Sequence, residues 1–197
     1  MKTLVLASSN EHKVKEFKKI LNDFNIITMK EIGFNDDIEE NGETARENAL
    51  IKAEAIHKFC EAQGLKYYVV ADDTGLCVNA LNGAPGVYSA RYAGGHGNSE
   101  ANRNKVLKEL EGKADRSAYF NCAIALISPN GRAIEVEGQT DGVITAKPEG
   151  DNGFGYDSIF FSNDLGKTFA VASEEEKNSV SHRGRALEKL LKEIDNI

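Results

Sequence analysis

Two short polar segments carry residue types that suit phosphate chemistry. The first consists of Ala7-Ser8-Ser9-Asn10-Glu11-His12-Lys13. It follows an apolar run, Thr3–Ala7, that is predicted as a buried strand, and it leads into a helix predicted over Asn10–Asn22. Such a junction presents backbone N–H groups and the positive end of the helix dipole to an anion, and Lys13 adds an ammonium one turn later. The segment predicts either a phosphate site or a simple helix cap made by Ser9 or Asn10.

The second segment places two adjacent acids after another apolar run. Its residues are Ala71-Asp72-Asp73-Thr74-Gly75-Leu76, and we predict that a buried strand over Tyr67–Ala71 ends there in a turn. Adjacent strand residues point to opposite faces, so only one of the two carboxylates is expected to face a ligand. Mg²⁺ takes one or two carboxylates together with phosphate oxygens and water. The segment Glu39-Glu40-Asn41-Gly42, at the end of an acidic loop over Gly33–Gly42, could supply a second ligand; alternatively, these acids are solvated loop charges.

The charge of the chain sets a condition on any anionic ligand. The formal net charge is −7 and the isoelectric point is near 5.2, so the chain lacks the basic surface of a nucleic-acid-binding protein. An anion therefore needs local positive charge or a bound cation, and Lys13, Lys52 and Lys177 are the candidate lysines. We expect the two segments to converge on one polyphosphate that is bridged by a divalent cation.

Composition excludes several other classes of protein. No apolar run approaches the roughly 18 residues of a membrane span, and the N-terminal apolar run is too short for a signal peptide. The cysteines Cys60, Cys77 and Cys122 are scattered, which indicates reduced thiols. The histidines show no spacing typical of zinc ligands. We therefore expect a soluble, cytoplasmic protein that binds neither membrane nor nucleic acid.

Two further segments could recognise a nucleobase. In Gly153-Phe154-Gly155-Tyr156-Asp157 an aromatic residue lies between two glycines, so its ring face could stack on a base. The alternative is a glycine turn with a core aromatic. Ser181-His182-Arg183-Gly184 opens the last predicted helix, and its donors could bind acceptor atoms of a ligand. The alternative there is that Ser181 simply caps the helix.

The order of predicted elements indicates an α/β fold with a mixed central sheet flanked by helices. A capping box at Thr44-Ala45-Arg46-Glu47 opens a helix that ends near Gly64. Further helices are predicted over Asn98–Leu110 and Ser181–Ile194, and further strands over Ile26–Met29, Ala118–Ile127, Arg132–Gln139 and Ser158–Phe161.

Six motifs in this order resemble the inosine triphosphate pyrophosphatase family, also called the Ham1 or RdgB family. Besides the two polar segments and the two candidate base segments, the motifs include a run from Glu40 to Ala53 and the segment Gly83–Tyr92. The resemblance extends from Leu4 to about Leu190. It implies a single domain over residues 1–197 with an elongated α/β fold, two lobes around a substrate cleft, and usually a homodimer.

The resemblance also implies an activity and a set of site residues. The activity is Mg²⁺-dependent hydrolysis of ITP, dITP and XTP to the monophosphate and pyrophosphate. Residues Ser8 to Lys13 would bind the triphosphate, Asp73 would be the proton acceptor and a metal ligand, and Glu40 would be a second acid at the metal. The remaining substrate contacts would be Lys52, Thr74, Phe154, Gly155, Tyr156, Asp157, Lys177, His182 and Arg183.

The chain departs from the usual family pattern at three places. Ser8-Ser9-Asn10 stands where Thr-Gly-Asn is common, and the loss of the glycine restricts the loop slightly. Thr74 stands where serine is common, which keeps the hydroxyl. Ser158 follows Asp157 where the family commonly has proline, which bears on the rigidity of the segment Gly153–Asp157, called the base loop below, and leaves the chemistry unchanged.

Hydrogen-bond donors predict how the base is selected. Hypoxanthine and xanthine carry a 6-oxo acceptor, whereas adenine carries a 6-amino donor that would face the donors of His182 and Arg183. A buried mismatch of this kind can reject a substrate by roughly 10⁴-fold.

Two rival interpretations of the sequence are a Maf-like pyrophosphatase acting on dTTP, UTP or modified pyrimidine nucleotides, and a non-catalytic nucleotide sensor.

Overall fold

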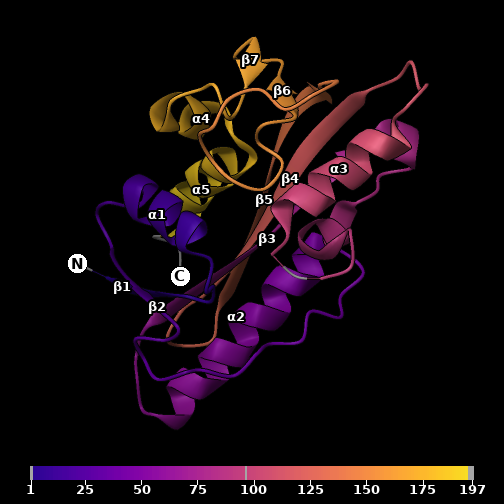
Figure 1. Ribbon diagram of the computed structural model, residues 1–197. Helices are drawn as coiled ribbons and strands as arrows, with labels where there is room; N and C mark the ends of the chain where they lie inside the picture. Colours follow the sequence, from indigo (N-terminus) through magenta and orange to yellow (C-terminus); the bar gives the residue numbers. More distant parts are fainter. Residues whose placement is uncertain (1, 96, 195–197) are drawn as a thin grey trace. The chain divides into compact units, whose positions relative to one another are not determined.

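The computed structural model describes residues 2–95 and 97–194. In this part of the chain the strands follow the order β2-β1-β3-β4-β5-β6-β7 in one sheet (Figure 1). Strand β1 pairs in parallel with β2 and β3, whereas β6 pairs antiparallel with β5 and β7. The predicted mixed α/β class is therefore confirmed. The strands are β1 (Thr3–Leu6), β2 (Asn25–Thr28), β3 (Tyr68–Val78), β4 (Ser117–Ile127), β5 (Ala133–Ile144), β6 (Phe160–Ser162) and β7 (Lys167–Thr168).

The chain forms two compact units. Unit 1 takes the described residues of Met1–Asp73, Cys122–Gly138 and Ala186–Ile197, and unit 2 takes those of Thr74–Asn121 and Gln139–Arg185. Strands β3, β4 and β5 contribute residues to both units. The helices are α1 (Glu11–Ile20), α2 (Ala45–Ala62), α3 (Ser99–Glu109), α4 (Glu174–Val180) and α5 (His182–Glu193), with 3₁₀ turns over Asn79–Leu81 and Gly86–Arg91.

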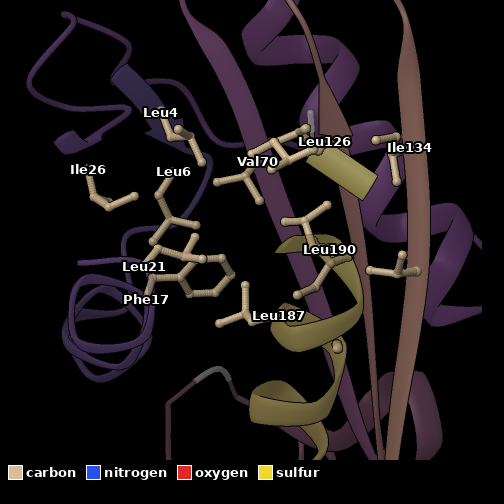
Figure 2. Packing of buried hydrophobic residues seen from close by; sticks show 14 of the residues in the cluster. Leu4, Leu6, Phe17, Leu21, Ile26, Val70, Leu126, Ile134, Leu187 and Leu190 are labelled. Atoms are coloured by element: carbon tan, nitrogen blue, oxygen red, sulfur yellow. The ribbon is translucent and has the colours of Figure 1, made fainter. Parts of the chain in front are cut away.

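Side-chain alternation along the strands divides the core of unit 1 into two clusters. Leu4 and Leu6 of β1 pack in a cluster with α1 and α5 residues such as Phe17 and Leu187, as Figure 2 shows. Val5 of the same strand belongs to the other cluster, which contains the apolar face of α2. Within unit 1, helices α1 and α5 therefore cover one face of the strands and α2 covers the other, an arrangement visible in Figure 1.

Unit 2 has its own aromatic core. Phe120 of β4 lies 4.6 Å from the ring centroid of Phe160 of β6, and Phe160 lies 5.1 Å from Phe169. These rings pack with buried aliphatic side chains of β3 and α3, including Leu76 and Val106. Each unit thus buries an apolar cluster assembled from segments distant in the sequence.

Local capping explains where several helices begin. The predicted capping box at the start of α2 is confirmed: Thr44 Oγ1 accepts from the Glu47 amide at 3.1 Å, and Glu47 Oε2 accepts from the Thr44 amide at 3.3 Å. Asn98 caps α3. Helix α4 was not predicted, although Ser173 and Glu176 form a second capping box at its start.

Candidate active site

The N-terminal polar segment caps α1. Asn10 Oδ1 accepts from the amides of His12 at 3.0 Å and Lys13 at 3.3 Å, and Ser8 Oγ accepts from the Asn10 amide at 3.2 Å. The helix-cap interpretation is therefore confirmed. The side chains of Ser9, Asn10, Glu11 and His12 are exposed, so a phosphate could reach the segment even though side chains already bind several of its amides.

The ammonium of Lys13 joins this segment to the acidic one. Lys13 Nζ lies 3.0 Å from Asp72 Oδ2, and the Asp72 side chain is 0% exposed. The two segments therefore meet, as predicted, at this ion pair within unit 1, whereas their convergence on one cation-bridged polyphosphate stays a prediction. Because Asp72 lies in β3 and is buried against Lys13, this ion pair also ties the N-terminal loop to β3.

The backbone around the two acids differs from our prediction. Strand β3 does not end in a turn at Asp72 and Asp73 but continues to Val78. The prediction was wrong because Asp, Thr and Gly are typical of turns, whereas here Leu76 and Val78 are fully buried and keep the strand in the core of unit 2. Alternation still applies: Asp72 is fully buried, whereas 13% of the Asp73 side chain is exposed.

Asp73 and Glu40 approach the same ammonium. Lys52, on α2, places Nζ 2.7 Å from Glu40 Oε2 and 3.8 Å from Asp73 Oδ1. The Lys52 side chain is only 11% exposed. The acidic loop, α2 and β3 therefore bring two carboxylates and one lysine into a single polar cluster, which we call the carboxylate cluster.

Burial changes the proton affinities within the carboxylate cluster. Desolvation raises the pKa of Asp73 above its ordinary value, since it outweighs the opposing attraction of Lys52 and Lys13. For Lys52, desolvation is the largest influence and lowers the pKa, but the combined attraction of Asp73, Glu40 and Asp72 leaves the pKa raised. Lys52 is accordingly a stable cation, and Asp73 is a stronger base than an exposed aspartate.

The carboxylate cluster fits a hard divalent cation with an incomplete set of protein ligands. Within residues 2–95 and 97–194, no group of three His, Cys, Asp or Glu side chains is arranged to hold a metal ion. One or two carboxylates are nevertheless the protein ligands that Mg²⁺ takes when substrate phosphates and water complete its coordination. Glu40 and Asp73 would supply the protein ligands.

In unit 2, the glycine-flanked aromatic segment forms a loop closed by Asp157. Asp157 Oδ2 accepts from the Phe154 amide at 2.9 Å and from Lys177 Nζ at 2.8 Å. The Lys177 ammonium also lies 4.7 Å from the centroid of the Phe154 ring. Lys177 and Asp157 are each 6% exposed at the side chain. Three predicted base-site residues therefore lie together: Asp157 and Lys177 form a buried ion pair, and Phe154 contacts both.

His182 and Arg183 are buried at the start of α5. The His182 ring stacks on Phe120 with centroids 4.6 Å apart and an interplanar angle of 20°. Arg183 donates from Nη2 to Thr74 Oγ1 at 3.1 Å. Ser181 Oγ accepts from the Gly184 amide at 3.0 Å, so the predicted serine cap is confirmed. Thr74 and Arg183, both predicted as substrate contacts, therefore touch one another within unit 2.

The family model described as the Ham1 family matches residues 4–193. This chain belongs to the Ham1 family. The match includes every residue of the carboxylate cluster and of the base loop.

Members of the Ham1 family resemble the chain over its whole length. A protein of Clostridium perfringens named dITP/XTP pyrophosphatase is 48% identical, with 100% of this chain and 99% of the relative covered. A protein of Bacillus subtilis with the same name is 46% identical, with 99% and 98% covered. The solved structure of the Staphylococcus aureus Ham1 protein has a TM-score of 0.87 and 42% identity, with 99% of each chain covered.

Sequence reasoning missed several residues that hold the Ham1 family motifs in place. Asn48 contacts Asp73, and Arg103 donates from Nη1 to the Gly155 carbonyl at 2.8 Å. The Tyr156 hydroxyl donates to the Ser89 carbonyl at 2.6 Å. Asn48 lies inside the quoted motif, which was the available signal for it. Contacts from α3 and from the Gly86–Arg91 turn thus fix the base loop. They do so in a chain that has Ser158 where the family commonly has proline.

Replacing Gly153 by alanine should destabilise the base loop more than the same change at Gly155. Both glycines have positive φ, +73° and +60°, so each alanine costs about 1–2 kcal/mol of backbone strain. At Gly153 the new Cβ would also lie 2.1 Å from Asp157 Oδ2, whereas at Gly155 it meets nothing within 4 Å. Thermal melts of the two variants provide the measurement. Equal melting temperatures would contradict the constraint imposed by Asp157.

Proposed function

We propose that the protein hydrolyses dITP, ITP and XTP, with their deoxy counterparts, to the monophosphate and pyrophosphate. The observation that carries the proposal is the carboxylate cluster in unit 1. It lies beside the Lys13–Asp72 ion pair of the N-terminal loop, in a chain whose full-length relatives are named dITP/XTP pyrophosphatase. Removing such nucleotides keeps deaminated purines out of the precursor pool.

Asp73 is assigned the role of general base. Attack of water on the α-phosphorus requires a proton acceptor and stabilisation of the departing pyrophosphate. The pKa of Asp73 is raised by burial, which brings its proton affinity closer to that needed at neutral pH. Because Asn48 and Lys52 contact the carboxylate from α2, it stays oriented while a proton moves.

Two lysines of unit 1 are assigned the role of neutralising the negative charge of the phosphates. Lys13 and Lys52 would neutralise the negative charge that develops on the departing pyrophosphate, and serine and asparagine side chains of the N-terminal loop would position the triphosphate. By analogy with an oxyanion-hole donor, each such contact contributes about 3 kcal/mol to transition-state stabilisation. These positive groups also offset the net charge of −7 that opposes binding of an anion.

Glu40 and Asp73 would hold Mg²⁺ together with phosphate oxygens and water. When bound, the cation supplies neutralisation of phosphate charge and lowers the pKa of coordinated water. Lys52 contacts both carboxylates, so it keeps the two acids near one another despite their mutual repulsion.

The base loop and the start of α5 are assigned to the purine. Phe154 would stack on the base, and Lys177, His182 and Arg183 would present donors to the 6-oxo group. Adenine places an amino donor at the same position, so an adenine nucleotide would leave buried donors unpaired. Asp157 and Thr74 hold Lys177 and Arg183, respectively, in their observed positions.

Pyrophosphate release from a substrate panel tests the proposed function. Purified protein with Mg²⁺ should act on dITP and XTP at least about 100-fold more efficiently than on ATP, because of the donor mismatch. Preference for dTTP would favour a Maf-like enzyme. Tight nucleotide binding without pyrophosphate release would favour a sensor, and release of orthophosphate would contradict attack at the α-phosphorus.

Chelation should abolish the reaction reversibly. Treatment with EDTA is expected to lower dITP turnover by at least about 10³-fold, because two carboxylates near the phosphates need a compensating cation. Adding excess Mg²⁺ should restore the rate, which excludes damage by the chelator. Undiminished turnover in EDTA would show that the reaction does not depend on a divalent cation.

We also propose that the active form is a homodimer in the cytoplasm, as the family resemblance implies. Cys60, Cys77 and Cys122 form no disulfide, which suits a reducing compartment. Among the described residues, no helix has the length and apolar character needed to span a membrane. Sedimentation equilibrium should give twice the mass of the chain.

A further inference from the structure

Asn48 lies where the acidic loop, α2 and β3 meet. It belongs to the first turns of α2 and is 1% exposed. Its Oδ1 accepts from the Gly42 amide at 2.8 Å, and its Nδ2 donates to Asp73 Oδ2 at 3.2 Å. One side chain therefore binds both the loop that carries Glu40 and the carboxylate of Asp73.

The orientation of the Asn48 amide follows from its partners. Only the oxygen can accept from a backbone N–H, so the NH₂ group must face Asp73. Asp73 Oδ2 is consequently held as an acceptor, while Oδ1 is the oxygen nearer Lys52, at 3.8 Å. Rotation of the Asp73 carboxylate would break the bond to Asn48.

The loop side of this contact is tightly packed. A Cβ on Gly42 would lie 2.7 Å from Asn48 Oδ1 and 2.7 Å from Glu47 Cβ. In addition, Glu47 Oε2 accepts from the Glu43 amide at 2.7 Å. The end of the acidic loop is thus bound to the first turns of α2, and Asn48 is held on a rigid element.

We propose that Asn48 is a positioning residue that sets the orientation of Asp73 and its separation from Glu40. The inference rests on the proposed function and deepens it, since it names a residue that controls the carboxylate cluster without touching substrate. Residues that orient metal ligands typically contribute 10- to 100-fold to metal affinity or activity.

Asn102 offers a matched control in unit 2. It is 3% exposed, its Oδ1 accepts from the Ala93 amide at 2.7 Å, and its Nδ2 donates to the Ala90 carbonyl at 3.2 Å. Burial and bonding pattern match those of Asn48, but both partners are backbone groups. A purely structural role for Asn48 would make alanine substitutions at the two positions behave alike.

The test combines kinetics with direct metal binding. Asn48→Ala should lower kcat for dITP about 10- to 100-fold, change KM by less than about threefold, and weaken Mn²⁺ binding, measured by electron paramagnetic resonance with a non-hydrolysable dITP analogue, about tenfold. Asn102→Ala should lower the melting temperature and leave Mn²⁺ affinity within about twofold, since neither Glu40 nor Asp73 loses a contact.

A second variant keeps the loop contact. Asn48→Asp has the same shape and can still accept from the Gly42 amide, but its other oxygen faces Asp73, so kcat should fall at least about 30-fold. The inference is overturned if both Asn48 variants fold and retain kcat and, for Asn48→Ala, Mn²⁺ affinity within twofold of the parent. A parent that binds Mn²⁺ but releases no pyrophosphate overturns the proposed function alone; a parent that binds no Mn²⁺ overturns both.

Discussion

Replacing Asp73 by asparagine should lower pyrophosphate release from dITP by at least about 10³-fold, the upper part of the range for loss of a general base. The change keeps the shape of the side chain, and its amide oxygen can still accept from Asn48. It removes the charge and the ability to take a proton. Because Lys13, Lys52 and the base loop are unchanged, dITP should still bind. Single-turnover pyrophosphate assays and calorimetric titration with dITP measure the two quantities.

Asp23→Asn provides the matched control, because Asp23 is an exposed aspartate in the same unit. It should keep turnover within about twofold of the parent, as expected for a distant surface substitution. Both variants should melt within about 4 °C of the parent, a shift that corresponds to roughly 1 kcal/mol in a chain of this size. Near-normal turnover by a folded Asp73→Asn protein would remove Asp73 from the base role.

Replacing Lys13 by methionine should have the largest effect on stability. The substitution removes the ammonium 3.0 Å from Asp72 Oδ2, whose side chain is 0% exposed. Breaking a buried ion pair from one side costs roughly 3–5 kcal/mol, which corresponds to a fall in melting temperature of roughly 6–20 °C. Calorimetric melts provide the measurement. Turnover should also fall at least about 100-fold, because a phosphate contact is lost.

Two further variants separate charge burial from lost phosphate binding. Lys13→Met combined with Asp72→Asn removes the isolated charge, so most of the stability should return while turnover stays low. Lys18→Met changes an exposed lysine of the same helix, and its effect should be below about 1 kcal/mol. A Lys13→Met protein that melts like Lys18→Met would show that the ion pair with Asp72 contributes little.

Much of unit 1 could be predicted because its elements carry strong local signals. The run Thr3–Leu6 places alternate side chains in two separate clusters, as a strand covered on both faces must. The capping box at Thr44 marks the start of α2 to within one residue. These features depend on neighbours in the sequence, so a single chain reveals them.

The extent of β3 could not be predicted because tertiary contacts override local propensity there. Gly75 resembles a turn residue, but a Cβ at this position would lie 2.6 Å from the Gly86 carbonyl oxygen. The glycine therefore permits close backbone approach within a continuous strand. The missed helix α4 is a different case, since Ser173 and Glu176 offered a capping signal that was overlooked.

The types of residue that form the candidate site could be predicted from the sequence. The contacts between their side chains could not. The Asn48–Asp73 hydrogen bond joins residues 25 positions apart, and the Arg183–Thr74 bond joins residues 109 positions apart. No periodicity or spacing in the sequence specifies such pairs, because they depend on the register of packed elements. The roles assigned to Glu40, Lys52 and the base-loop residues stay predictions.

Locating a bound metal tests the central claim most directly. Crystals grown with a non-hydrolysable dITP analogue and Mn²⁺ should show anomalous density bonded to carboxylate oxygens of Glu40 and Asp73 and to phosphate oxygens of the analogue. The triphosphate should contact the loop from Ser8 to Lys13. Metal and triphosphate bound away from these two carboxylates would contradict the account.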